Sequence, residues 1–263
     1  MSSKWEMYDR LIRGIPEDVI VDDYGIGCVW TYVQAGGSKG LALTVRQRAG
    51  KQEEIRPLIG HPLREAAELV KSWNFMEATI GMAAINAWYN SVEKSDEKGL
   101  LDPDAQGNDK GDVFRVFGSD VKDKKVAVIG HFPYLERKLE PICQLSILER
   151  DPLEGDYPDS ACEYILDDQD YVFITGMTLT NKTLPRLLEL CENAKVCIVG
   201  PSAPLSDILF DYGVYCISGF CATDNEKIAE ILRRGGRQEV FKGGQMVNYY
   251  NPRMQENKTD NIG

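Results

Sequence analysis

The sequence predicts an α/β protein in which a parallel sheet of about five strands follows a small α+β domain. Three observations favour this fold class. Five short apolar runs rich in Val and Ile occur after residue 123, and segments with helical spacing alternate with them. Such alternation is typical of a parallel sheet with right-handed crossovers and helices on both faces. The composition also changes once, at a polar stretch over residues 93–123, which predicts two domains in this chain of 263 residues.

The predicted strands of the second domain, residues 124–263, are apolar on both faces, as expected where helices cover both sides of a sheet. Their sequences are KVAVIG, QLSILE, DYVFITG, KVCIVG and VYCIS. The segments between them with helical spacing are FPYLERKLEPI, PDSACEYILDD, TLPRLLELCEN and PLSDILFDYG. A last helix is predicted over TDNEKIAEILRRGG, with Thr223 as its candidate N-cap and Gly235 at its end.

Residues 1–92 predict the small α+β domain, which begins with a helix. Strand-like segments follow, and the pair Gly36-Gly37 fits a hairpin turn. The pair His61-Pro62 predicts the start of a second helix. The segment ATIGMAAINAWYN predicts an apolar helix that small residues allow to pack closely. We interpret residues 93–123 as a linker, part of which lies against one of the domains.

Charge and cysteine usage narrow the classes of function. The net charge of −11 repels phosphate backbones and anionic lipids, so neither nucleic acid nor a membrane surface is an expected partner. No run of 18 apolar residues and no apolar targeting segment is visible. The seven cysteines are odd in number and show no C-x-x-C spacing, which favours reduced cysteines and a cytoplasmic protein. With two histidines, one chain cannot build a histidine-rich zinc site.

The residues that follow each strand are the candidates for ligand binding, because ligands of open parallel sheets bind beyond the carboxyl ends of the strands. Gly130, Gly176 and Gly200 stand at three of these ends, where glycine lets the backbone turn and approach a ligand. The first loop, VAVIGHFPY, is not G-x-G-x-x-G, so NAD binding in the usual manner is not expected. Glu149 occupies the place of the ribose-binding acid, and whether it contacts ligand or solvent stays open.

His131 is the candidate catalytic residue, since an imidazole in this loop can act as acid, base or single metal ligand near neutral pH. The alternative is that it caps the following helix. A second group of candidates follows the third strand, where Thr178, Asn181 and Thr183 gather hydroxyl and amide groups near a helix N-terminus. Ser202 repeats this pattern after the fourth strand. These groups suit a carboxylate, a phosphate or a hydroxylated ring, whereas N-capping would need one or two of them.

The segments VAVIGHFPY, DYVFITGMTLTNKTL, VCIVGPSAPL and ATIGMAAINAWYN together resemble an uncharacterised prokaryotic family named for "putative heavy-metal chelation". The resemblance implies a Rossmann-like domain preceded by a domain similar to the N-terminal domain of enolase. It implies a site between the two domains, with Asn86 and the strand around Thr44 facing the Rossmann-like loops. It also implies a role in handling metals or metal-binding small molecules, without supplying a reaction.

The sequence therefore predicts that the protein binds or processes a small metal-chelating or pterin-like molecule between its domains. Two alternatives stay open: a non-catalytic protein that binds or delivers a chelate, and a Rossmann-like methyltransferase. The expected partner is a small molecule or metal chelate, and a homodimer is left open. The sequence does not decide whether the protein is an enzyme, nor does it identify a cofactor or a metal.

Overall fold

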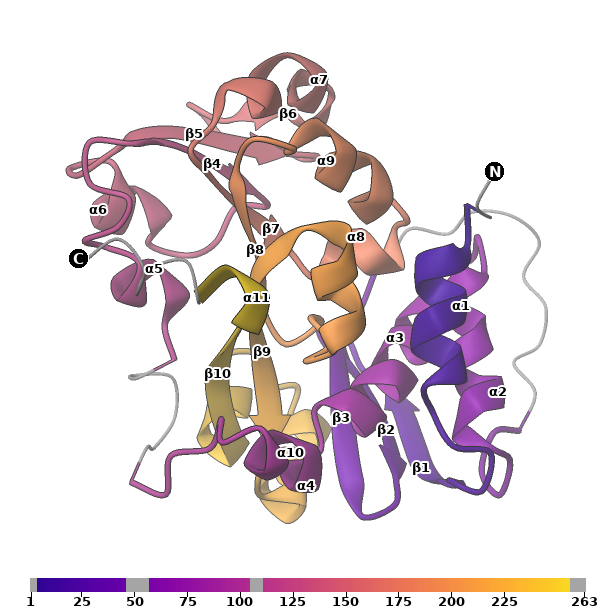
Figure 1. Ribbon diagram of the computed structural model, residues 1–263. Helices are drawn as coiled ribbons and strands as arrows, with labels where there is room; N and C mark the ends of the chain where they lie inside the picture. Colours follow the sequence, from indigo (N-terminus) through magenta and orange to yellow (C-terminus); the bar gives the residue numbers. More distant parts are fainter. Residues whose placement is uncertain (1–3, 46–56, 105–110, 256–263) are drawn as a thin grey trace.

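The computed structural model describes residues 4–45, 57–104 and 111–255, and in these ranges the chain forms two sheets (Figure 1). The smaller sheet is an antiparallel meander of β1 (Val21–Ile26), β2 (Trp30–Ala35) and β3 (Ser38–Leu43). The larger sheet has seven strands in the order β10-β9-β8-β7-β4-β5-β6. The predicted fold class, a mainly parallel α/β sheet after a small α+β unit, is confirmed.

The larger sheet contains all five predicted parallel strands, β4, β5, β7, β8 and β9, together with two strands that were not predicted. Its members are β4 (Lys125–Ile129), β5 (Gln144–Glu149), β6 (Tyr157–Pro158), β7 (Tyr171–Thr175), β8 (Lys195–Val199), β9 (Val214–Ala222) and β10 (Gly244–Tyr250). Every neighbouring pair is parallel except β9 and β10. Counted along the chain, the first six have the order 3-2-1-4-5-6, in which the direction of winding reverses between β4 and β7. Doubly wound sheets bind ligands at this reversal.

Helices and short 3-10 turns connect these strands, and the last helix follows β10. They are α6 (Leu135–Leu139), η2 (Asp159–Ala161), α7 (Cys162–Ile165), η3 (Leu166–Asp168), α8 (Met177–Thr180), α9 (Leu184–Leu190), η4 (Asp207–Tyr212), α10 (Asn225–Arg233), η5 (Glu239–Gly243) and α11 (Pro252–Gln255). Asp224, not Thr223, caps α10, because its carboxylate accepts from the amide of Lys227 at 2.9 Å. None of the helices in the described ranges has the length and apolar character needed to cross a bilayer.

The first unit packs helices against its meander. They are α1 (Glu6–Arg13), α2 (Leu63–Glu68), η1 (Leu69–Lys71), α3 (Phe75–Tyr89) and α4 (Val92–Glu97). The predicted turn at Gly36 and Gly37 is present, with φ of +56° and +74°. Helix α3 lies so close to β3 that a Cβ on Gly40 would stand 2.0 Å from the amide nitrogen of Ala87. The likeness of this unit to the N-terminal domain of enolase stays a prediction.

The segment predicted as a linker carries secondary structure at both of its ends. Helix α4 begins at Val92, and α5 (Val113–Val116) packs on the larger sheet. Phe114 and Phe117 of this segment contact Phe173 of β7 edge to face, with centroids 5.3 and 5.7 Å apart. Part of the segment therefore belongs to the core of the second unit, while the predicted boundaries at 92 and 124 stay predictions.

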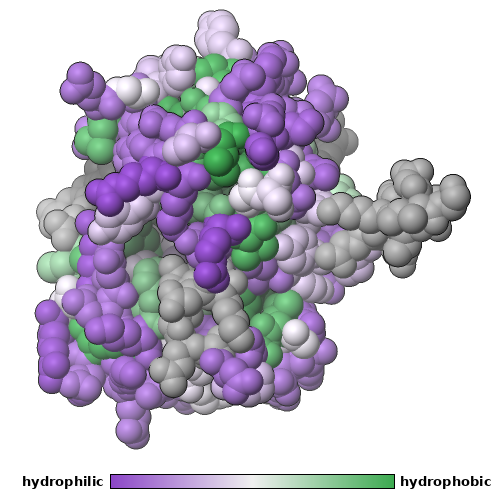
Figure 2. Space-filling view, turned by 90° about the vertical axis from the view of Figure 1, so that its left-hand side faces the viewer, coloured by the Kyte–Doolittle hydropathy of each residue, from purple (hydrophilic) through white to green (hydrophobic). Residues whose placement is uncertain are grey.

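The two units share one apolar core, so their relative position is fixed by packing. Side chains of α1 and α3 belong to the same buried cluster as side chains of β4, β7 and β8. The hydroxyl of Tyr8, which is 1% exposed, donates to the carbonyl of Leu179 at 2.9 Å. On the outer face shown in Figure 2, hydrophilic side chains predominate and hydrophobic ones form small areas between them.

Candidate functional site

A pocket of about 850 Å³ lies at the carboxyl ends of β4, β5, β7 and β8. The first unit contributes Trp30, Leu43 and Val45 to its wall, and the C-terminal region contributes Arg237 and Phe241. Sites for small organic molecules have volumes of about 300–1,000 Å³ and mostly apolar walls with a few polar groups. The size, place and lining of this pocket are those of such a site.

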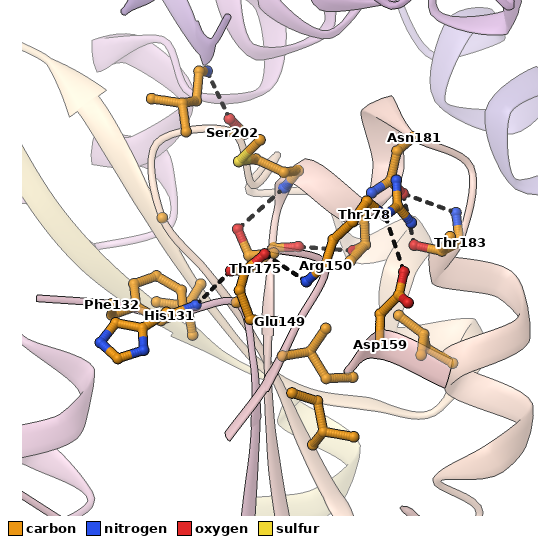
Figure 3. Close-up of a pocket in the computed structure, with 18 of the residues that line it drawn as sticks. His131, Phe132, Glu149, Arg150, Asp159, Thr175, Thr178, Asn181, Thr183 and Ser202 are labelled. Atoms are coloured by element: carbon orange, nitrogen blue, oxygen red, sulfur yellow. Dashed lines mark hydrogen bonds and ion pairs between the residues drawn. The ribbon is translucent and has the colours of Figure 1, made fainter. Parts of the chain in front are cut away.

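Most of the predicted site residues line this pocket (Figure 3). The eight that do are Gly130, His131, Glu149, Thr178, Asn181, Thr183, Gly200 and Ser202. Asn86 and Gly176 are not among the lining residues. The topology thus brings together loops that are up to 72 residues apart in the chain, from Gly130 to Ser202.

The three predicted glycines have two different functions. Gly130 and Gly200 have φ of +98° and +108°, which side chains with a Cβ rarely adopt, so each allows a sharp turn at a strand end. Gly176 allows close packing between loops, because a Cβ there would stand 2.6 Å from the amide nitrogen of Ala203 and 2.7 Å from the carbonyl carbon of Ser202. Gly176 supports the wall from behind, where the sequence predicted a direct ligand contact.

Both carboxylate oxygens of Glu149 accept hydrogen bonds from the backbone. Oε2 accepts from the amide of His131 at 2.8 Å, and Oε1 accepts from the amides of Arg150 at 2.6 Å and Asp151 at 3.3 Å. These amides stand where a doubly wound sheet offers donors to an anionic ligand. The side chain of Glu149 therefore fills this anion position, and a ligand phosphate has no access to it while the carboxylate stays in place.

The imidazole of His131 is held by carboxylates on both sides. Its Nδ1 lies 3.0 Å from Oδ2 of Asp156, whose side chain is 3% exposed, and its Nε2 lies 3.1 Å from Oε1 of Glu136. In Figure 3 the ring points away from the labelled threonines. Neither Asp156 nor Glu136 lines the pocket. This geometry favours an anchoring role for the ring, and the catalytic role stays a prediction.

The polar groups after β7 are partly used to hold their own turn. The hydroxyl of Thr178 donates to the carbonyl of Thr175 at 2.7 Å. Oδ1 of Asn181 accepts from the hydroxyl of Thr183 at 2.6 Å and from its amide at 3.1 Å, so these atoms are used within the turn that precedes α9. The Nδ2 donors of Asn181 make no hydrogen bond with a described residue. They are the polar group of this turn that is available to a ligand.

Two predicted residues connect the units beside the pocket. The hydroxyl oxygen of Ser202 accepts from the amide of Leu43 at 2.9 Å. Nδ2 of Asn86, a residue that is 1% exposed, donates to the carbonyls of Leu41 at 2.8 Å and Pro201 at 3.1 Å. Asn86 thus faces a loop of the larger sheet, as the resemblance implied, but from behind the pocket wall.

Lys182 lines the pocket and was not predicted. Its φ of +67° is unusual for a residue with a Cβ, and such conformations are frequent at functional sites. Its Nζ donates to the carbonyl of Ser72 in the first unit and, at 2.9 Å, to that of Thr180. Burial lowers its pKa to about 8. The only sequence signal was a lysine inside a run of hydroxyl residues, and its partner in the first unit is 110 residues away.

The charged residues of the pocket include two ion pairs that the sequence did not predict. Nε of Arg150 donates to Oδ2 of Asp159 at 2.9 Å. Nε and Nη2 of Arg186 donate to the two carboxylate oxygens of Glu163 at 3.0 and 2.6 Å. The hydrogen bond from Arg186 lowers the pKa of Glu163. Both pairs lie on the wall formed by β5, η2, α7 and α9.

The described part of the chain contains no group of three or more His, Cys, Asp or Glu residues placed to hold a metal ion. Cys162 lines the pocket as a single thiol, and burial raises its pKa to about 11. Since thiolates, not thiols, bind metals, this side chain is a poor metal ligand near neutral pH.

The fold is that of a two-unit α/β protein with a pocket between its units. The chain belongs to the family DUF364, described as "Putative heavy-metal chelation", which matches residues 112–251. A second family with the same description, DUF4213, matches residues 8–89. The likeness to this family that the sequence motifs suggested is confirmed.

Relatives in three organisms extend this likeness over nearly the whole chain. An uncharacterised protein of Methanocaldococcus jannaschii is 29% identical, with 89% of this chain and 91% of the relative covered. A crystal structure of a DUF364 protein of unknown function from Desulfitobacterium hafniense is 45% identical, with a TM-score of 0.86 over 94% of this chain and 98% of that one. Another, from Pyrococcus horikoshii, has a TM-score of 0.74 at 23% identity, covers 93% and 98%, and supports the fold alone.

Proposed function

We propose that this protein binds a small metal-chelating molecule in the pocket between its two units. The observation that carries the proposal is the pocket itself, which takes apolar walls from both units and polar groups from the loops after β5, β7 and β8. The family description supplies the connection with heavy-metal chelation. The described residues offer no metal-ligand cluster, so a chelating small molecule would bring the metal ligands.

The proposed contacts with the ligand use the hydrogen-bond donors of the pocket that make no bond with the described residues. Nδ2 of Asn181 and the hydroxyl proton of Ser202 are available, because the hydrogen bonds of these residues with the described chain use their oxygens as acceptors. The apolar side chains of Leu43, Ile129 and Leu190 would pack against the carbon skeleton. A flat pterin-like ring also fits this combination of apolar walls and a few donors.

Binding is favoured over the alternative of a methyltransferase by the contacts of Glu149. In doubly wound sheets the acidic residue at this position binds ribose hydroxyls, and the preceding glycine-rich loop admits a nucleotide. Here the carboxylate of Glu149 is bound to backbone amides of both loops. Whether bound molecules are also converted depends on His131, whose ring nitrogens both face carboxylates.

A pair of matched variants tests the proposal. Leu190→Trp fills the pocket, whereas Leu188→Trp places the same ring on the same helix at a partly buried position outside the lining. Nitrilotriacetate, ethylenediamine diacetate and bipyridine, with and without Ni²⁺, are titrated into each protein by calorimetry. We expect saturable binding of at least one probe to the wild type and to Leu188→Trp, and its loss in Leu190→Trp. Equal binding to both variants would place the ligand elsewhere.

A further inference from the structure

The charges of the described residues that line the pocket are balanced, although the whole chain is acidic. The chain has 41 acidic and 30 basic residues. Among the described residues, the lining has four of each: Arg150, Lys182, Arg186 and Arg237 against Glu149, Asp151, Asp159 and Glu163. A lining with equal numbers of positive and negative side chains matches a ligand that carries both positive and negative groups. Opposite charges attract such a ligand, and like charges repel a ligand of a single sign.

In one of the two ion pairs described above, all three guanidinium nitrogens of the arginine already bind carboxylates of the protein. Arg186 donates from Nε and Nη2 to Glu163 and from Nη1 to Glu189 at 2.9 Å. Three of its donor nitrogens are thus bound to carboxylates. A ligand would have to break a bidentate pair to reach this guanidinium, and bidentate pairs are the stronger ones.

The other pair, Arg150 and Asp159, has free atoms on both sides. A single hydrogen bond joins Nε to Oδ2, and within the described ranges neither the terminal nitrogens of Arg150 nor Oδ1 of Asp159 makes a hydrogen bond. The side chains are 47% and 46% exposed, and ion pairs with such exposure are held weakly. Figure 3 shows Arg150 extended toward Asp159.

We propose that Arg150 and Asp159 recognise a zwitterionic group of the ligand. A ligand carboxylate would bind the terminal nitrogens of Arg150, and a ligand ammonium would bind Oδ1 of Asp159. This inference rests on the proposed function and names its substrate class, an aminocarboxylate chelator. Metal ions bind the same amine and carboxylate in their deprotonated forms, so the pocket takes the chelator free of metal.

Three probes separate the charge classes in calorimetric titrations of the full chain at pH 7. Ethylenediamine diacetate carries ammonium and carboxylate groups, tricarballylate carries carboxylates alone, and diethylenetriamine carries ammonium groups alone. We expect ethylenediamine diacetate to bind most tightly. Arg150→Met and Asp159→Asn should each weaken it by about tenfold or more, the effect of losing a charge-assisted hydrogen bond. Arg234→Met, whose partner is Glu230 and which lies outside the lining, should leave its affinity within about twofold, as surface substitutions do.

Saturation with Ni²⁺ gives a second readout, because coordination removes the free ammonium and carboxylate. We expect the nickel complex of ethylenediamine diacetate to bind more weakly than the free molecule. If tricarballylate binds as tightly as ethylenediamine diacetate, or if the nickel complex binds as tightly as the free form, zwitterion recognition is wrong while a chelator pocket stands. If none of the three probes binds, the inference is also wrong, and the comparison of Leu190→Trp with Leu188→Trp still decides the proposed function.

Discussion

The hydroxyl oxygen of Ser202 accepts a hydrogen bond from the backbone amide of Leu43 at 2.9 Å, across the junction of the two units. Ser202 follows β8 of the larger sheet, and Leu43 ends β3 of the smaller one. Both residues line the pocket. This hydrogen bond therefore joins the two halves of the pocket wall, so changes at this junction should affect ligand binding and stability together.

Ser202→Ala tests this junction. The variant leaves the amide of Leu43 without its acceptor, and we expect the free energy of unfolding to fall by about 1–3 kcal/mol. Ligand affinity should fall as well. Ser160→Ala is a suitable control, because Ser160 lines the pocket at an exposed position and should cost less than about 0.5 kcal/mol. Urea unfolding of both variants is the measurement, and equal stability would contradict the structural role of Ser202.

The hydrogen bonds of the Asn86 amide predict which of two substitutions at this position destabilises the protein more. In Asn86→Asp a carboxylate oxygen would face the carbonyls of Leu41 and Pro201, which now accept hydrogen bonds at 2.8 and 3.1 Å. Asn86→Ala would only remove the donors, at a cost of about 1–3 kcal/mol. We expect Asn86→Asp to be the less stable variant at pH 7 in thermal unfolding. The reverse order would show that the amide is not oriented as described.

His131→Ala separates the two interpretations of this residue. Without the ring, the carboxylate of Asp156, 3% exposed, keeps one donor among the described residues, the amide of Leu153 at 2.9 Å. We expect stability to fall by about 1–3 kcal/mol with ligand affinity nearly unchanged. A variant as stable as the wild type in which turnover of a bound molecule falls by about 10²–10⁴-fold would instead establish acid–base catalysis.

Lys182 predicts a dependence of stability on pH. Burial lowers its pKa from 10.5 to about 8, so between these values the unfolded chain binds the proton more strongly than the folded chain. Stability rises with pH wherever the unfolded state binds more protons. The free energy of unfolding of the wild type should therefore rise relative to Lys182→Met from about pH 8 to pH 10.5. A constant difference over this range would mean that the ammonium of Lys182 is not buried at a cost.

Gly176→Ala tests the packing behind the pocket. The new Cβ would meet backbone atoms of Ser202 and Ala203 at 2.7 and 2.6 Å, which cannot move like the end of a flexible side chain. Overpacking of this kind costs about 1–3 kcal/mol. In Gly118→Ala the nearest atom is the carbonyl oxygen of Arg115 at 3.3 Å, so a smaller loss is expected. Equal losses in denaturant titrations would contradict the close approach.

The fold could be predicted where periodicity was strong and local. The five parallel strands are continuous apolar runs, and helical segments alternate with them. This combination is typical of a parallel sheet whose strands are covered on both faces. The edge strand β10 was missed because GQMVNYY follows an irregular segment and pairs antiparallel with β9. The two-residue β6 is too short to leave a pattern.

The site could be predicted in part, because topology places the residues after each strand at one edge. Contacts between the units could not be predicted, since they join positions far apart in the chain. Trp30 is an example: its indole nitrogen donates to the carbonyl of Arg237 at 2.9 Å, across 207 residues. The partner of a polar side chain was equally hidden: the hydroxyl of Thr183 donates to Oδ1 of Asn181, and a ligand contact of either residue stays a prediction.

The central claim is that the pocket between the two units holds a small metal-chelating molecule. Native mass spectrometry after incubation with a prokaryotic metabolite extract tests it most directly. We predict that the wild type and Leu188→Trp gain the mass of one organic compound with amine and carboxylate groups, and that Leu190→Trp does not. Retention of metal ions without an organic compound, to the same extent in Leu190→Trp, would contradict the claim.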